Sequence, residues 1–130
     1  MNIIQKTNKI QRFTDLEVWK ESHKLTLLIY EYTKHFPKSE TFGLISQIRR
    51  AVVSNESCIA EGFSRFHFKD RLNFYFDARG SLAEVETQSL ISKDLKYLTD
   101  KQHQEISGQC KKVEIILAGL IRSTQNLSRS

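Results

Sequence analysis

Proline and glycine are scarce in this chain, which has one proline and five glycines among 130 residues. A sheet with many tight turns needs more of both residues, so their scarcity favours long, uninterrupted helices. The two cysteines, Cys58 and Cys110, lie far apart and show no CxxC spacing. We therefore expect two reduced thiols that pack as small apolar residues, in preference to a disulfide.

Long apolar runs are also missing. No stretch approaches the roughly 18 apolar residues of a membrane span, and the N-terminal sequence MNIIQKTNKIQRF lacks the apolar core of a signal peptide. The sequence thus predicts a cytoplasmic protein without membrane segments. Its 39% hydrophobic and 27% charged residues are ordinary for a globular protein, and its length fits one domain.

Patterns that carry enzymatic chemistry are absent as well. The chain has no glycine-rich phosphate loop and no HExxH sequence, and every serine except Ser64 falls on a predicted helix or in a tail. A di-iron bundle needs Glu-x-x-His pairs, but Ser64 follows Glu61 and Thr87 follows Glu84 at that spacing. We predict no catalytic site, no cofactor and no metal. The scattered histidines are expected to be surface or interface side chains: His23, His35, His67 and His103.

Positive charge exceeds negative charge by five, with 20 Lys and Arg against 15 Asp and Glu. Residues 1–14 carry +3 and residues 99–130 carry +2, so the excess sits at the two ends of the chain. A basic balance favours polyanionic partners. The side chains that we consider as phosphate contacts are Arg49, Arg50, Arg65, Lys69, Arg71, Arg79, Lys111 and Lys112.

Apolar periodicity predicts four helices, at about 15–36, 39–61 and 67–97 and from 99 onward. Because the connections between them are short, consecutive helices become antiparallel neighbours. The predicted fold class is therefore all-α, an antiparallel up-down-up-down four-helix bundle over residues 13–124, with a basic tail at 1–12 and a second tail at 125–130. The predicted helix caps are Thr14 or Asp15, Ser39, Gly62, and Thr99 with Gln102.

The stretch FHFKDRLNFYF, residues 66–76, resembles an aromatic strand of an RNA-binding sheet or one face of a helix. A long helical pattern follows it without a turn, which excludes the strand. The apolar arc of this third helix is about 200° wide, against the ~100° that one bundle core needs. Soluble monomers seldom leave such a surplus exposed. We therefore predict self-association, in preference to a different partner, through Phe74, Tyr75 and Phe76.

Polar residues form a line on each of the two middle helices. These lines are either solvated faces or a partly buried network, such as Arg50 with Glu84 or Glu61, that sets helix register or assembly geometry. Gly80, in the middle of the third helix, is predicted to permit the close approach of another helix. The two lines comprise Gln47, Arg50, Ser54, Ser57 and Glu61 on the second helix, and Asp77, Ser81, Glu84 and Gln88 on the third.

Several short motifs occur in the order found in a known family. They are LEVW at 16–19, QIRRA at 47–51, IAEG at 59–62 and RGSLxExET at 79–87, together with the helix stop at Phe36-Pro37. Over about residues 13–120, the chain resembles a bacterial four-helix-bundle family encoded in intervening sequences of 23S ribosomal RNA genes. A related branch is the accessory variability protein of diversity-generating retroelements.

The resemblance implies a homopentameric barrel without enzymatic activity and with a role in binding nucleic acid. In the retroelement branch, the barrel also binds a reverse transcriptase and its RNA. The matching motifs make Arg49, Arg50 and Arg79 candidate phosphate contacts, and we add the basic residues Arg65, Lys111 and Lys112. We expect a non-catalytic oligomer that binds RNA or DNA, such as ribosomal or mobile-element RNA. The alternative is a scaffold that docks a partner protein such as a reverse transcriptase.

Overall fold

The computed structural model describes residues 9–129, which contain no β-strand. The predicted all-α class is therefore confirmed for this part of the chain. The elements are the 3₁₀ turns η2 (Phe13–Asp15) and η3 (Lys38–Glu40) and four α-helices: α1 (Glu17–Thr33), α2 (Leu44–Phe63), α3 (Phe68–Asp94) and α4 (Asp100–Ser128). Residues 1–8 of the predicted basic tail lie outside the described part, and α4 continues past the predicted boundary at 124.

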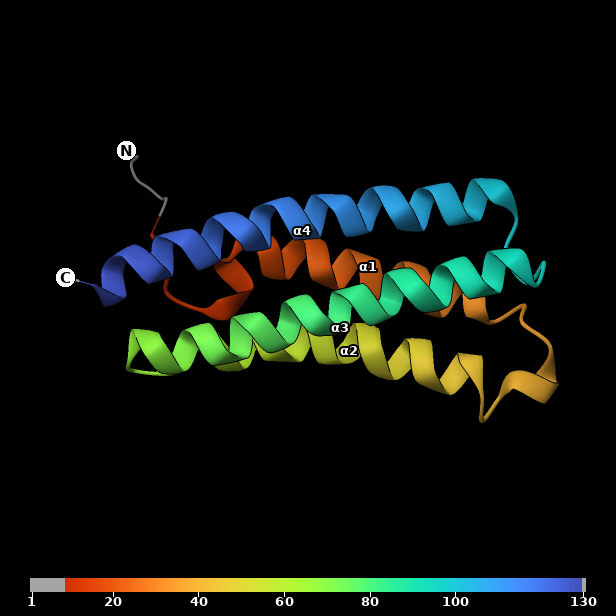
Figure 1. The fold of residues 1–130 in the computed structure, drawn as a ribbon, viewed down its shortest axis with the longest axis horizontal. Coiled ribbons are helices and arrows are strands. Elements are labelled where there is room, and N and C mark those ends of the chain that lie inside the picture. The colour runs from red at the N-terminus through yellow and green to blue at the C-terminus, as the bar shows by residue number, and fades with distance from the viewer. Residues whose placement is uncertain (1–8, 130) are drawn as a thin grey trace.

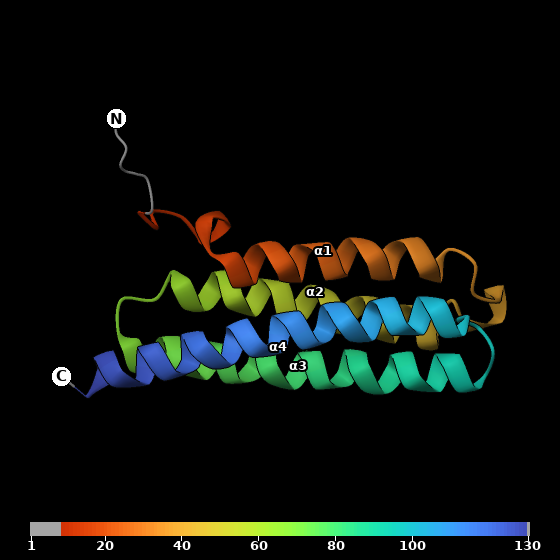
Figure 2. The same ribbon diagram turned by 90° about the horizontal axis from the view of Figure 1, so that it is seen from above.

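The four helices lie side by side along the long axis of the molecule, and their connections lie at its two ends (Figures 1 and 2). In Figure 2, α1 and α3 run away from the end that holds the C-terminus of the chain, and α2 and α4 run back toward it. Each helix packs against two neighbours, α1 and α3 each contacting both α2 and α4. The α2–α3 pair has the most extensive contact.

The apolar stripes predicted on the first, second and fourth helices meet in one core. Cys110 belongs to this core, and its burial raises the pKa of the thiol to about 12. Both cysteines are free, as expected, with Cys58 half-buried. The fully buried side chains of the core include Leu25 and Ile29 on α1, Ile48, Val52 and Ile59 on α2, Leu82 and Val85 on α3, and Ile106, Val113 and Leu117 on α4.

A buried amide joins three of the helices at the centre of this core. Asn55 of α2 is 0% exposed. Its Nδ2 donates to the carbonyl oxygen of Ala78 on α3 at 2.8 Å, and its Oδ1 accepts a hydrogen bond from Ser22 Oγ on α1 at 2.5 Å. A buried polar group is stable only when it is bonded, so these contacts select one axial position for each of the three helices. No pattern in the sequence singled out Asn55.

Of the predicted helix caps, the one at Thr99 is confirmed. The backbone N–H of Gln102 donates to Thr99 Oγ1, and the backbone N–H of Thr99 donates to Gln102 Oε1, both at 3.0 Å. The caps of the first two helices are wrong. The Asp15 carboxylate accepts hydrogen bonds from the backbone N–H groups of residues 11 and 12. It therefore caps the start of η2, which precedes α1, and not α1 itself. Ser39 lies within η3, and Glu40 caps α2 instead, accepting from the N–H of Leu44 at 3.0 Å.

The roles predicted for Gly62 and Gly80 are not found in the protomer. Gly62 does not end α2 in a left-handed conformation, since no glycine among residues 9–129 has a positive φ. It is buried inside α2, where an added Cβ would lie 2.7 Å from Cε1 of Tyr75 and 3.0 Å from Cβ of Phe74. Gly62 therefore permits the close approach of α2 and α3. An added Cβ on Gly80 would meet nothing within 4 Å in the protomer.

At the end of the bundle far from the chain's C-terminus, one carboxylate joins two connections. Tyr97 lies between α3 and α4, and its hydroxyl donates to Glu40 Oε2 at 3.1 Å, which raises the pKa of the phenol. The other carboxylate oxygen of Glu40 is the one that caps α2. The Tyr97 ring also packs on Phe36, with the ring centroids 5.5 Å apart.

Replacing Asn55 with alanine is expected to lower the free energy of unfolding by about 2–4 kcal/mol, because Ser22 loses its buried partner and a cavity forms. Urea denaturation followed by circular dichroism measures the change. Ser57→Ala, an exposed change on the same helix, is the control and is expected to stay within about 0.5 kcal/mol of the wild type. An Asn55→Ala loss no larger than that of the control would contradict the bridging role.

Alanine substitutions at Gly62 and Gly80 are expected to change the free energy of unfolding in opposite directions. Gly62→Ala is expected to cost about 1–3 kcal/mol, since the buried Tyr75 ring must move. Gly80→Ala, in open space within the same helical pair, is expected to gain about 0.5–1 kcal/mol from helix propensity. Urea unfolding of both variants at one protein concentration tests the pair, and a stabilising Gly62→Ala would rule out the close-approach role.

Candidate nucleic-acid interface

Arg49 joins α1 and α2 through its side-chain contacts. Its Nε donates to Thr33 Oγ1 at 2.9 Å, and its guanidinium lies over the Tyr30 ring, 4.5 Å from the centroid. Both partners belong to α1, whereas Arg49 belongs to α2. The stacked and bonded guanidinium is thus a tie between α1 and α2, and we do not carry Arg49 forward as a phosphate contact.

Arg50 joins α2 to α3 across the predicted polar lines. One of its terminal nitrogens lies 3.1 Å from Glu84 Oε2, one of the two pairings that the sequence left open, and also donates to Gln47. Both side chains of the Arg50–Glu84 pair remain about half exposed, so the pair contributes little to stability. Ser54 and Ser81 complete the line with hydroxyl oxygens 2.9 Å apart. The polar lines form a hydrogen-bonded seam at the surface of the α2–α3 pair.

The two lysines of α4 are each near a carboxylate. Lys111 lies 3.5 Å from Glu114 on its own helix, and Lys112 lies 3.7 Å from Glu21 on α1. Glu21 is buried and also accepts a hydrogen bond from Gln109 Nε2 at 2.9 Å, which is the main reason that its pKa is lowered. Each lysine thus has a carboxylate of its own protomer nearby, and Lys112 shares Glu21 with Lys24, which lies 3.2 Å from it.

Arg65 and Arg79 stack on aromatic rings. The Arg65 guanidinium lies 4.6 Å from the Phe74 centroid, and one of its nitrogens is 3.2 Å from Glu61. Arg79 lies 5.1 Å from the Phe76 centroid and has no ion pair among residues 9–129. The six predicted cations thus come from several sides of the bundle, and their partners lie on different helices.

The turn between α2 and α3 collects basic and aromatic side chains at one end of the bundle. We call Arg65, Phe66, His67, Lys69 and Arg71 the turn surface. The Arg71 guanidinium contacts the rings of Phe63 and Phe68, at 5.3 and 5.4 Å from their centroids, and its Nε donates to the carbonyl oxygen of Arg65 at 2.7 Å. Lys69 is exposed and forms no ion pair within the described chain.

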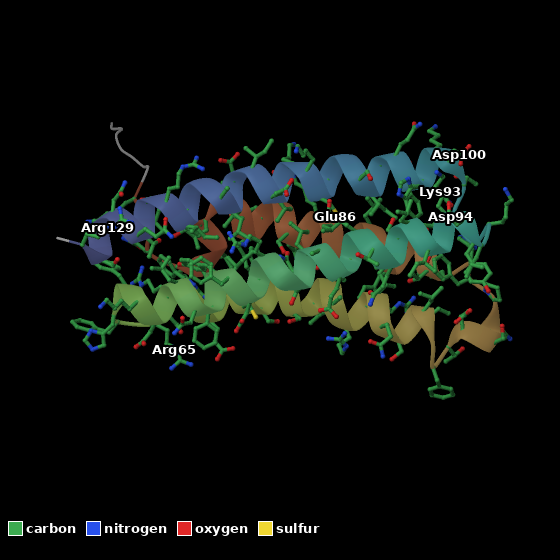
Figure 3. All side chains as sticks on the ribbon, viewed as in Figure 1. Arg65, Glu86, Lys93, Asp94, Asp100 and Arg129 are labelled. Atoms are coloured by element: carbon green, nitrogen blue, oxygen red, sulfur yellow. The ribbon has the colours of Figure 1, made fainter. Side chains whose placement is uncertain are left out.

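Figure 3 contrasts the two ends of the molecule. Arg65 lies at the end that also holds Arg129, whereas at the other end Lys93 is grouped with Asp94 and Asp100. The turn surface was recognisable in the sequence as cations on both sides of Phe66. Lys69 and Arg71 are among the eight cations considered from the sequence, but they are not among the six predicted phosphate contacts.

The three aromatic residues predicted at an oligomer interface are in different environments. Tyr75 is 1% exposed in the protomer core, so its ring offers no surface to another subunit, and the prediction for Tyr75 is wrong. The reason is the close approach of α2 at Gly62. Phe74 is half-buried beneath Arg65, and Phe76 is 36% exposed. Further exposed apolar side chains are Leu90 and Ile91 on α3 and Leu95 directly after it.

Residues 9–129 contain no group of three or more His, Cys, Asp or Glu side chains placed to hold a metal ion. Within the same residues, no helix combines the length and the apolar character needed to cross a bilayer.

Comparisons with known proteins identify the family. The structure is similar to the crystal structure of a protein of unknown function from the S23 ribosomal protein family of Bacteroides thetaiotaomicron, with a TM-score of 0.74 and 20% identity. That similarity covers 81% of this chain and 95% of the other, and it bears on the fold alone. No curated protein matches the chain. The model of the family described as 23S rRNA-intervening sequence protein matches residues 14–119. The chain therefore belongs to the 23S rRNA-intervening sequence protein family.

Proposed function

We propose that this protein is a non-catalytic, cytoplasmic oligomer that binds nucleic acid, RNA in particular, through the turn surface and the adjacent part of α3. The observation that carries the proposal is a pair of exposed cations in the first half of α3. Lys69 and Arg79 have no carboxylate partner among residues 9–129, so their positive potential is available to phosphates.

The proposed assembly is a homopentameric barrel built from antiparallel up-down-up-down protomers. Exposed apolar side chains on α3, including Phe76 and Leu90, supply the surface for contact between copies. A single protomer offers a modest basic surface. Repeating that surface around a symmetry axis strengthens its field and lets one nucleic acid contact several copies at once.

A second candidate function is a scaffold that docks a protein such as a reverse transcriptase. The observation that favours it is the internal pairing of several predicted cations. Arg50, Lys111 and Lys112 each lie near a carboxylate of their own protomer. Cations neutralised in this way contribute less to a polyanion field.

The first prediction from this proposal concerns salt-dependent binding. Affinity for a fluorescein-labelled RNA stem–loop, measured by anisotropy, is expected to fall linearly on a log–log plot between about 50 and 300 mM salt. The variant Arg65→Gln/Lys69→Gln/Arg79→Gln is expected to bind about tenfold or more weakly at low salt. Its slope is expected to be shallower by about 0.7–0.9 for each phosphate that the variant no longer neutralises.

The matched control removes the same number of positive charges at the other end of the bundle, with Lys93→Gln/Lys96→Gln/Lys101→Gln. This variant is expected to keep most of the affinity. Equal losses in the two triple variants would show that net charge alone governs binding. If the wild-type protein binds no RNA at the lowest salt, the nucleic-acid function is excluded and the scaffold function is favoured.

The second prediction concerns the mass of the assembly. Light scattering is expected to give about 76 kDa, five times the 15.2 kDa of the chain. Phe76→Asp places a charge on the exposed α3 surface and is expected to lower the mass. Ile115→Asp, at an exposed position on α4, is the control and is expected to leave the mass unchanged. A clean monomer in the wild type would exclude the barrel.

A further inference from the structure

The most exposed side chain of the turn surface is an aromatic ring. Phe66 follows the end of α2 and precedes the first residue of α3, and it is 88% exposed. Its ring contact within residues 9–129 is with its neighbour His67, nearly perpendicular at 84° with centroids 5.1 Å apart. The other aromatic residues of this region, such as Phe63, Phe68 and Phe74, are partly buried and lie against arginines.

We propose that Phe66 is a stacking platform for an unpaired base of single-stranded nucleic acid, with Arg65 and Lys69 contacting the flanking phosphates. This inference rests on the function proposed above and specifies the class of strand that the turn surface takes. Aromatic rings on a cationic surface are the usual means of holding single strands, because every base has a π-face.

The cations beside Phe66 retain donors for phosphate. A guanidinium has five N–H donors, and Arg65 uses one terminal nitrogen on Glu61 while its plane stacks on Phe74. The Lys69 ammonium forms no ion pair among the described residues. The acids of this region are Glu61, already paired with Arg65, and Asp70 in the first turn of α3. The charge around the ring therefore favours a polyanion over an apolar protein surface.

A groove lined by His67, the residue that follows Phe66, offers polar groups for the edge of a base. Its volume is about 580 Å³, and it lies between the start of α3 and the end of α4. His67, Asp70 and Ser128 supply donors and acceptors, and Phe68 and Leu127 supply an apolar wall. In a duplex the base faces are stacked on one another, and a protruding ring on a turn cannot reach them. An unpaired base can rotate onto the ring, which is why we specify a single strand.

Exposure alone does not single out Phe66, because Phe42 is 94% exposed. Phe42 precedes α2 and Phe66 follows it, so the two rings lie at opposite ends of a 20-residue helix. The nearby acid at the Phe42 end is Glu40, whose carboxylate caps α2. Phe42 is thus an equally bare ring at the end of the bundle far from the turn surface, where the cation nearest to it in sequence is Lys38, and it provides a control for ring exposure.

The test compares Phe66→Ala, Phe66→Trp and Phe42→Ala with the wild-type protein. The probes are fluorescein-labelled oligo-U and oligo-dT of about 12 nucleotides and a blunt RNA duplex of similar length. Phe66→Ala is expected to bind the single strands about tenfold more weakly at an unchanged salt slope, because it removes base stacking and leaves the phosphate-binding cations in place. Duplex affinity, and every affinity of Phe42→Ala, are expected to match the wild type.

Phe66→Trp supplies a second readout. It is expected to bind single strands at least as tightly as the wild type, and its exposed indole is expected to lose fluorescence when a base stacks on it. The half-buried Trp19 is measured separately in the wild type as background. The ratio of the oligo-U and oligo-dT affinities tells whether RNA or DNA is preferred, and weaker binding by Phe66→Ala in either arm supports stacking.

Failure of this inference can be distinguished from failure of the proposed function. If the wild type binds with a steep salt dependence but Phe66→Ala binds single strands equally well, the stacking platform is excluded and nucleic-acid binding stands. If no probe binds at low salt, the proposed function fails and the platform fails with it. A changed oligomer mass in Phe66→Ala would assign the ring to a subunit contact and overturn the inference.

Discussion

The architecture depends on the Asn55 amide, which binds α1 and α3 from a position fully inside the core. Apolar packing alone allows neighbouring helices to slide by a turn at little cost, whereas a buried amide must meet particular partners. Gly62, two helical turns further along α2, then lets α3 come close. Because both contacts lie on the half of α2 that leads to the turn, they fix where α3 begins and where Phe66 projects.

Charge pairing within the protomer determines where positive potential remains. The carboxylates near Arg50, Lys111 and Lys112 offset those cations along the sides of the bundle. Lys69 and Arg79 have no such partner among residues 9–129. Lys69 and Arg79 thus retain their charge on and beside the turn surface, and other cations without an ion pair among residues 9–129, such as Lys93, Lys96 and Arg122, lie elsewhere on the bundle.

Sequence analysis predicted the features that repeat along a single helix. It failed where the environment of a residue depends on a neighbouring helix. The apolar periodicity that predicted the helices also marks their buried faces, for example at Leu25 and Val113, because burial imposes the helical period on any stripe. The prediction for Gly62 was wrong because no local pattern encodes the distance to a neighbouring helix, and within the protomer no helix lies close to Gly80. A helical wheel of the third helix gives the width of its apolar arc. It does not show that α2 covers Tyr75. The cations were recognisable as residues, but their neutralisation depends on distant carboxylates, such as Glu21 for Lys112.

The link between Tyr97 and Glu40 makes the two ends of the molecule mechanically unequal. One carboxylate holds the start of α2 and the α3–α4 connection together, so separating these two segments costs at least the Tyr97 bond to Glu40. Among residues 9–129, no carboxylate ties the connection that bears Phe66 to a second connection in this way. The bundle is therefore braced by a side-chain link between connections at one of its two ends.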